Sequence, residues 1–133
     1  MPQETDNPME RVIRSDGRYP MEAYALLQEG LARAVRDKYG EETQDAPPGQ
    51  RHVSGRELCM GIHKVLLERY GMLARAVVAR WNIRGTIDFG NMVYLLIRHD
   101  FMHKTKEDSI EDFRDVFDFD KDLVVTDDFE LKE

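Results

Sequence analysis

The sequence predicts a mostly α-helical protein, a compact bundle of about five helices in a single domain. Three observations support this fold class. Apolar residues recur at three- and four-residue steps in several segments. Residues that start and stop helices flank those segments. The chain of 133 residues, 41% of them hydrophobic, is large enough to bury one core. The order of the later segments further suggests a helix-turn-helix or winged-helix arrangement with a short β-hairpin after residue 100.

The N-terminal end is expected to be irregular. Residues 1–8 are polar and include two prolines, so we expect them to be disordered and assign residues 9–123 to the helical domain. A short helix is predicted over Met9–Arg14, because the turn-forming pair Asp16–Gly17 follows it.

A long helix is predicted from Pro20 to Tyr39. Proline fits the first helical turn, where its missing N–H is not needed, and Gly40 is a typical stop residue. One face carries the apolar residues Tyr24, Leu27, Leu31, Ala34 and Val35. Residues 41–52 are expected to form a loop, since Pro47–Gly49 cannot continue a helix or a strand.

The clearest helix start in the chain is Ser54. The Ser54 hydroxyl can accept a bond from the backbone N–H of Glu57, and the Glu57 carboxylate can accept one from the N–H of Ser54. This capping box predicts a helix that ends at Gly71. Its apolar positions are Leu58, Ile62, Val65, Leu66 and Tyr70.

Two helices joined by a short turn are predicted next. The first covers Met72–Trp81, the turn Asn82–Gly85, and the second Thr86–Arg98, followed by a strand-like segment, Phe101–Lys104. We expect these two helices to form the centre of the core. Their predicted buried residues are Leu73, Val77, Trp81, Phe89, Met92, Val93, Leu96 and Ile97.

Beyond Lys104 the pattern allows two structures. Thr105 and Ser109 each precede an acidic residue by three positions and are competing helix starts. Aromatic residues from Phe113 onward can cover the core, or Val116–Phe119 can pair as a wing strand with the segment after residue 100. We favour a short helix followed by an extended segment.

The charge is divided unevenly along the chain. The net charge is −7, yet the segment Arg51–Lys104 has nine basic and four acidic residues, a net charge of +5. Thr105–Glu133 has twelve acidic and four basic residues, a net charge of −8. We assign residues 124–133 to an acidic C-terminal tail. Such a division is compatible with a polyanion-binding face beside an acidic tail.

Two functions are favoured on these grounds, and an enzymatic one requires His52, His63 and the acidic residues of the tail to converge in space. The first is a non-catalytic interaction or adaptor domain with a protein partner, favoured because the second helix of the pair carries Asp88 and Asp100 beside its single Arg98. The second is a winged-helix-like nucleic-acid-binding regulator whose acidic tail screens its basic face. Its phosphate contacts would come from Arg75, Arg80, Arg84 and Arg98.

Signatures of catalysis and cofactor binding are missing from the sequence. No GxGxxG, GxxxxGK[ST] or GxSxG motif occurs. The Asp118–Asp122 segment resembles the start of a calcium loop but lacks its later glycine and glutamate. We therefore assign no catalytic, cofactor-binding or metal-ligating residue, and the enzyme question leans towards no.

Neither the histidines nor the single cysteine predicts a metal or catalytic site. His99 and His103 have a spacing that could share a metal, but the helix is expected to end between them, while His52 and His63 lack ligand partners nearby in sequence. Cys59 has apolar neighbours and is expected to be a buried structural thiol.

A cytoplasmic protein without a membrane partner is expected. No apolar run approaches the roughly 18 residues of a membrane span, and the polar N-terminal stretch is unlike a secretory signal.

A series of motifs occurs in a fixed order between residues 18 and 120. They are Arg18–Pro20, His52–Gly55, Glu57–Leu58, Gly61, Trp81, Ile83–Arg84, Thr86, Asp88–Gly90, Lys104–Thr105, Asp108–Ser109, Asp112–Phe113 and Phe117–Phe119. Their order and spacing resemble a family of conserved hypothetical proteins from the planctomycete–verrucomicrobial group, and the resemblance implies no known activity. This chain departs from the family at Asn82, where glycine is more usual, and at His99–His103, where a small, apolar stretch is more usual.

Overall fold

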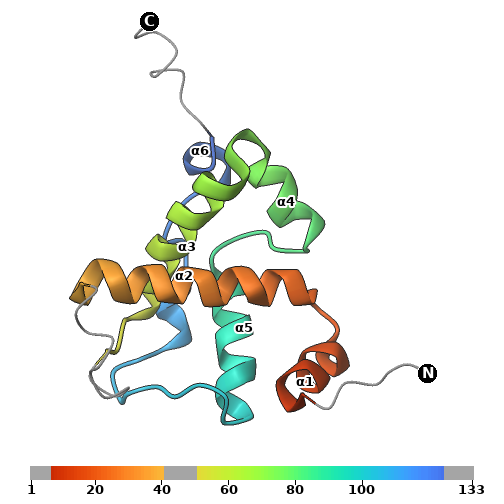
Figure 1. The fold of residues 1–133 in the computed structure, drawn as a ribbon, viewed down its shortest axis with the longest axis vertical. Coiled ribbons are helices and arrows are strands. Elements are labelled where there is room, and N and C mark those ends of the chain that lie inside the picture. The colour runs from red at the N-terminus through yellow and green to blue at the C-terminus, as the bar shows by residue number, and fades with distance from the viewer. Residues whose placement is uncertain (1–6, 41–50, 125–133) are drawn as a thin grey trace, which may run out of the picture.

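The computed structural model describes residues 7–40 and 51–124 (Figure 1). They form five helices of seven to nineteen residues, the single-turn α6, and two 3₁₀ turns, so the mostly α-helical prediction is confirmed. The elements are α1 (Pro8–Asp16), α2 (Met21–Tyr39), α3 (Gly55–Tyr70), η3 (Gly71–Leu73), α4 (Ala74–Arg80), α5 (Ile87–Arg98), η4 (Ile110–Phe113) and α6 (Phe119–Asp122).

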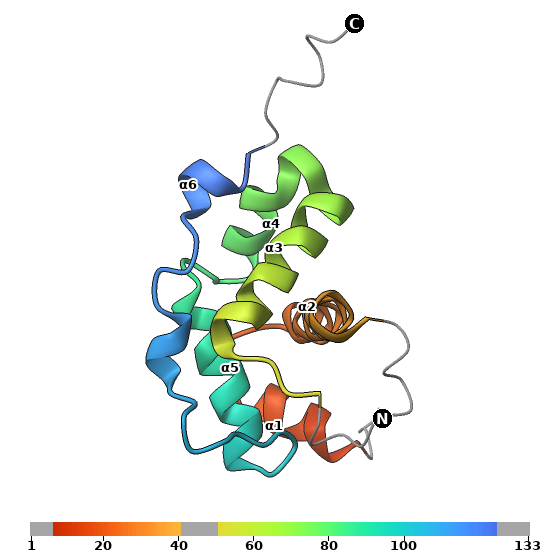
Figure 2. The same cartoon turned by 90° about the vertical axis from the view of Figure 1, so that its left-hand side faces the viewer.

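The closest packing in the fold is the crossing of α2 and α3. α2 lies across the molecule and α3 rises from it, and seen end-on α2 rests directly against α3 (Figures 1 and 2). A Cβ added to Gly61 would lie 2.4 Å from the backbone oxygen of Gly30, and one added to Gly30 would lie 2.3 Å from Cγ1 of Ile62. The two helices can approach this closely only because both positions lack a side chain.

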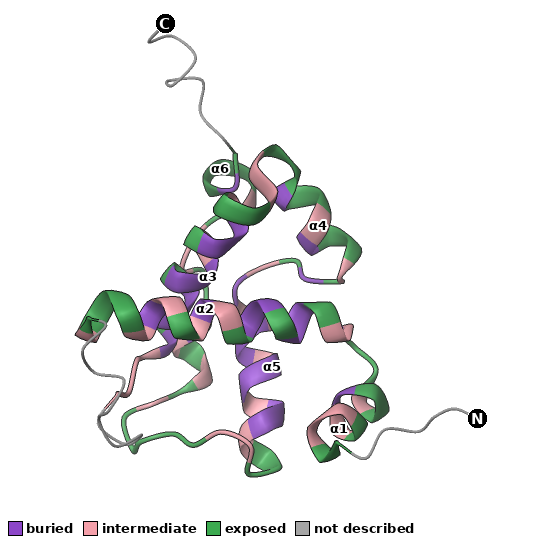
Figure 3. Cartoon of the chain, viewed as in Figure 1, coloured by how far each residue is buried: buried purple, intermediate pink, exposed green. Residues whose placement is uncertain are grey.

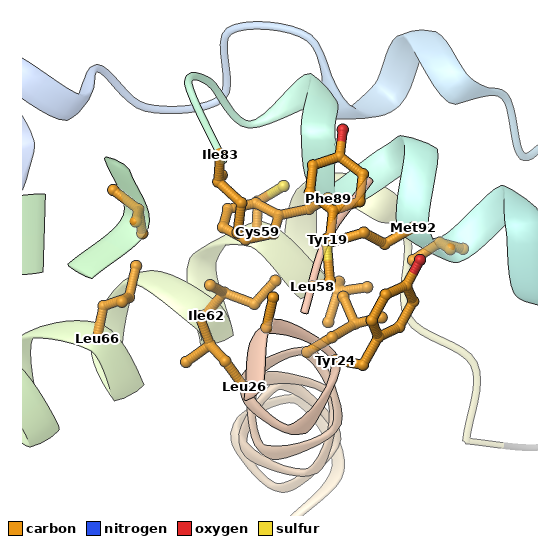
Figure 4. Close-up of a cluster of buried hydrophobic side chains, with 14 of the residues drawn as sticks. Tyr19, Tyr24, Leu26, Leu58, Cys59, Ile62, Leu66, Ile83, Phe89 and Met92 are labelled. Atoms are coloured by element: carbon orange, nitrogen blue, oxygen red, sulfur yellow. The ribbon is translucent and has the colours of Figure 1, made fainter. Parts of the chain in front are cut away.

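α5 is the central helix, enclosed along most of its length. Its buried positions occupy more than one face, as the purple ribbon in Figure 3 shows. Phe89 is fully buried beside residues from the start of α2, from α3 and from the α4–α5 turn (Figure 4). The other buried residues of α5 are Gly90, Met92, Val93, Leu95 and Leu96.

Helix starts agree closely with the sequence prediction. Both reciprocal bonds of the Ser54–Glu57 capping box are present, at 3.0 and 2.7 Å. α1 begins at Pro8, capped by the Asn7 side chain, although residue 8 was assigned to a disordered end. The rest of that end, residues 41–50 of the predicted loop and residues 125–133 of the predicted tail lie outside the described residues.

The buried face of α4 differs from the prediction. η3 precedes the helix, and the residues facing the core are Ala74 and Val78, whereas Leu73 is 65% exposed. Trp81 is only half-buried and packs edge-on against Tyr70, with ring centroids 6.0 Å apart. A 3₁₀ turn has three residues per turn, so it changes which positions of the following helix face inward.

The predicted β-hairpin after residue 100 is wrong for the described residues, which contain no strand. The two predicted helix starts, Thr105 and Ser109, both form local caps. The Asp108 carboxylate accepts the backbone N–H of Thr105, and the Asp112 carboxylate accepts the backbone N–H of Ser109, where η4 begins. These side chains satisfy backbone groups that a hairpin would pair across strands. The segment is anchored instead by the buried Phe113.

Phe113 is seated against two glycines. A Cβ at Gly55 would approach its ring to 2.6 Å, and one at Gly90 would approach it to 2.9 Å. The buried hydroxyl of Thr86 donates to the Phe113 carbonyl at 2.6 Å and accepts from the N–H of Val116 at 3.0 Å. These contacts fix η4 against α3 and α5.

Gly61→Ala is expected to lower the free energy of unfolding by about 1–3 kcal/mol, because the added methyl group meets backbone that cannot move aside. This loss would oppose the gain of up to about 1 kcal/mol from higher helix propensity. Gly85→Ala is the matched control, since a Cβ there meets nothing within 4 Å. Urea unfolding of the two variants measures the difference, and equal stabilities would contradict the close crossing.

Phe89→Ala should cost about 3–5 kcal/mol, the range for truncating a fully buried aromatic residue. Trp81→Ala should cost clearly less, because part of the indole stays in contact with water. Urea unfolding followed by far-UV circular dichroism provides both values. A larger loss for Trp81 would place the centre of the core around α4 rather than α5.

Candidate functional site

The outer side of α4 exposes apolar and cationic residues together. Met72 is 78% exposed and Leu73 is 65% exposed, although both are large apolar residues. We define the α4 surface as the exposed residues Met72, Leu73, Arg75, Ala76, Ala79 and Arg80.

A groove of about 550 Å³ runs along this surface. Its opposite wall is formed by Leu123 and Val124, which follow α6. Arg75 forms an ion pair with Asp120 of α6, with Nη2 2.9 Å from Oδ1, and both side chains are largely exposed. An exposed pair of this kind contributes little to stability, but it lies at the edge of the groove.

The four arginines predicted to contact phosphates do not share one surface. Arg75 and Arg80 lie on α4, and Arg84 lies in the turn that follows. Arg98 ends α5, a helix about 18 Å long that runs away from α4 to the opposite end of the molecule (Figure 1).

Asp88 has a local structural role at the start of α5. Its carboxylate accepts the backbone N–H groups of Arg84 and Gly85, at 2.7 and 3.2 Å, and the hydroxyl of Tyr19. Burial, together with the bond to Asp88, raises the pKa of Tyr19 to about 12. Asp88, an acidic residue that argues against DNA binding, therefore holds the turn before α5 and ties it to Tyr19, which precedes α2.

A second feature is a cavity of about 420 Å³ between the start of α3, α5 and the segment leading to η4. Sequence motifs far apart in the chain meet at its wall, namely His52–Gly55, Lys104–Thr105, Asp108–Ser109 and Asp112–Phe113. The cavity also has a largely apolar floor from α2, α3 and α5.

An imidazole–carboxylate pair lies in the cavity wall. Nε2 of His52 is 3.2 Å from the Asp108 carboxylate, which also accepts the N–H of Thr105 at 2.8 Å. Burial by itself would raise the pKa of Asp108, but the bond from Thr105 and the interaction with His52 outweigh it and lower that pKa. Sequence spacing missed this pair because 56 positions separate its members.

Tyr94 and Arg51 were also missed by the sequence analysis. Both line the cavity, and Tyr94 Oη and Arg51 Nε are buried without a hydrogen-bond partner among the described residues. Tyr94 lies between the apolar positions of α5, so nothing in the local pattern distinguishes it.

The remaining histidines and the cysteine have separate surroundings. Nε2 of His63 lies 2.7 Å from the Asp122 carbonyl, while His99 and His103 are exposed. Cys59 is fully buried as expected, and burial raises the pKa of its thiol to about 12. Within residues 7–40 and 51–124, no group of three or more His, Cys, Asp or Glu side chains could hold a metal ion.

Comparisons with protein-family models, with characterised proteins and with solved structures gave no match to this chain. The resemblance to the planctomycete–verrucomicrobial family therefore stays a prediction. None of the described helices has the length and apolar character needed to cross a membrane.

Asp108→Asn should make the stability of the protein less dependent on acid pH. The folded-state pKa of Asp108 lies below its unfolded value of about 4, so its ionised form contributes stability above that pH. This contribution is lost as pH falls through the folded-state pKa. Urea unfolding should show wild type more stable than the variant at pH 6, with the difference shrinking below about pH 4.

Asp115→Asn, at an exposed position, is the control for removing one negative charge. A wild-type advantage over Asp108→Asn that stays constant from pH 6 to pH 3 would contradict the assigned interactions.

Proposed function

We propose that this chain is a non-catalytic interaction domain that docks a protein partner on the α4 surface. The partner presents a segment in which apolar side chains are flanked by acidic residues. The observation that carries this proposal is the exposure of Met72 and Leu73 beside Arg75 and Arg80.

Burial of the apolar part of the surface against a partner would contribute to the binding free energy. Single exposed apolar residues are normal, but here two large ones are consecutive, and the first of them, Met72, lines a groove together with Ala76 and Ala79. Fully burying a Met or Leu side chain contributes about 1.5–3 kcal/mol. The small alanine side chains leave room for the partner's own apolar residues.

The charge on the same surface favours an acidic partner. No acidic residue occurs between Gly71 and Ile87, whereas Arg75, Arg80 and Arg84 all fall in this stretch. The Arg75–Asp120 pair is exposed, so an incoming carboxylate can compete for the guanidinium at little cost. Complementary charge would chiefly increase the association rate and fix orientation.

A nucleic-acid-binding regulator is the second candidate, favoured by the same three arginines. Two features give it less support than the protein partner. α5 is enclosed and has little free surface to enter a groove of DNA, and exposed aliphatic side chains do not improve contacts with phosphate.

The proposal predicts that Met72→Asp combined with Leu73→Asp abolishes partner capture. Immobilised full-length protein would be exposed to an extract of the source cells, and captured proteins quantified by mass spectrometry. We expect the double variant to lose at least about tenfold of the specifically captured protein, equivalent to 1.4 kcal/mol. Met60→Asp, at an exposed methionine on α3, is the matched control and should retain capture.

Wild type, Met72→Asp/Leu73→Asp and Met60→Asp would each be titrated with fluorescent duplex DNA and single-stranded RNA at low and at 150 mM salt. Capture that is unaffected by the double variant would overturn the α4 surface as the docking site. Binding of a nucleic-acid probe with steep salt dependence, lost in Arg75→Glu/Arg80→Glu, would favour the second candidate instead.

A further inference from the structure

We infer that the cavity between α3, α5 and the segment leading to η4 binds a small monocarboxylate with an apolar body. This site is separate from the α4 surface and does not depend on the function proposed for it. The inference rests on two unpartnered donors, the charge of the cavity wall, and its apolar floor.

The first observation is a concentration of unsatisfied donors. Among the described residues, three buried side-chain polar atoms lack a hydrogen-bond partner, namely Tyr24 Oη, Arg51 Nε and Tyr94 Oη. The last two belong to residues that line this one cavity. A buried donor left without a partner is destabilising, so two in one cavity indicate a group that binds there.

The nearby carboxylates are already engaged elsewhere. Asp108 accepts from Thr105 and interacts with His52, and Asp112 accepts the N–H of Ser109 at 3.1 Å. Their bonds hold the turns of the cavity wall. No group in residues 7–40 and 51–124 accepts a hydrogen bond from Arg51 Nε or Tyr94 Oη, so both are available to a bound acceptor.

The chemistry of the two donors defines the missing group. Burial, followed by the nearby charges of Asp108 and Asp112, raises the pKa of Tyr94, which keeps its phenol protonated and able to donate. The guanidinium of Arg51 is a charged donor. A neutral donor and a charged donor together favour an anionic oxygen acceptor.

The wall also limits the charge of that acceptor. Asp108 and Asp112 contribute two negative charges, and Arg51 and Lys104 contribute two positive ones. A wall without net positive charge does not offset the desolvation of a doubly charged phosphate, whereas a singly charged carboxylate loses less hydration. The balance therefore favours a monocarboxylate.

The rest of the cavity suits an apolar body. Its volume of about 420 Å³ lies within the usual range of small-molecule sites. Its floor is formed by apolar side chains from several elements, namely Leu31, Leu58, Val93, Ile97, Met102 and Phe113. Burying a chain of several carbons there would tighten binding by about fourfold per methylene group.

Isothermal titration calorimetry of the full chain with hexanoate and 4-phenylbutanoate tests the inference. Both should bind at one site per chain, whereas hexylamine and inorganic phosphate should not. Tyr94→Phe should weaken binding by about threefold to tenfold, and Arg51→Gln by at least about tenfold. Tyr24→Phe, which removes the unpartnered hydroxyl outside the cavity, is the matched control and should bind as wild type does.

Thermal unfolding without ligand would show whether each variant is folded, and Tyr94→Phe removes only an unsatisfied hydroxyl. The inference is overturned if neither carboxylate binds up to about 10 mM, if phosphate binds as well as the carboxylates, or if Tyr94→Phe and Arg51→Gln bind as wild type does. Met72→Asp/Leu73→Asp should leave carboxylate binding unchanged, so failure here and failure of the α4 proposal are distinguishable.

Discussion

The contact between the backbones of α2 and α3 at Gly30 and Gly61 sets the geometry of the whole fold. α3 can lie against α2 only where side chains are missing, so this crossing fixes the depth at which Ile62 enters the core. It also fixes both ends of α3. One end forms part of the cavity wall, and the other leads through η3 into α4. The two candidate binding surfaces thus depend on a contact that belongs to neither of them.

Elements governed by local chemistry could be predicted from the sequence. The capping box at Ser54 depends on residues three positions apart, and the structure contains both of its bonds. The predicted buried face of α4 was wrong because the 3₁₀ turn before the helix sets which residues face inward. Apolar spacing in the sequence does not reveal that turn. The predicted β-hairpin was wrong because Asp108 and Asp112 cap local turns instead. Those turns are held in place by Phe113, which packs against residues far away in the sequence.

The candidate sites also differ in whether their residues lie close together in the sequence. Arg75 and Arg80 were identified from sequence because they are neighbours on one short helix, whereas grouping Arg98 with them required knowing the direction of α5. The cavity could not be anticipated, since Arg51 and Tyr94 are separated by two helices and meet only after α3 and α5 have packed. Long-range packing, rather than residue type, creates that site.

The cavity wall is attached to the rest of the fold through Phe113 and Thr86, and not through the regular backbone hydrogen bonds of a helix or a sheet. One aromatic ring seated against two glycines, and two hydrogen bonds to a single hydroxyl, hold the end of the covering segment. None of these contacts involves Gly30 or Gly61, so the wall and the α2–α3 crossing are held by separate sets of contacts. Because local opening and global unfolding have different free energies, the strength of the wall is set by these contacts and not by the crossing.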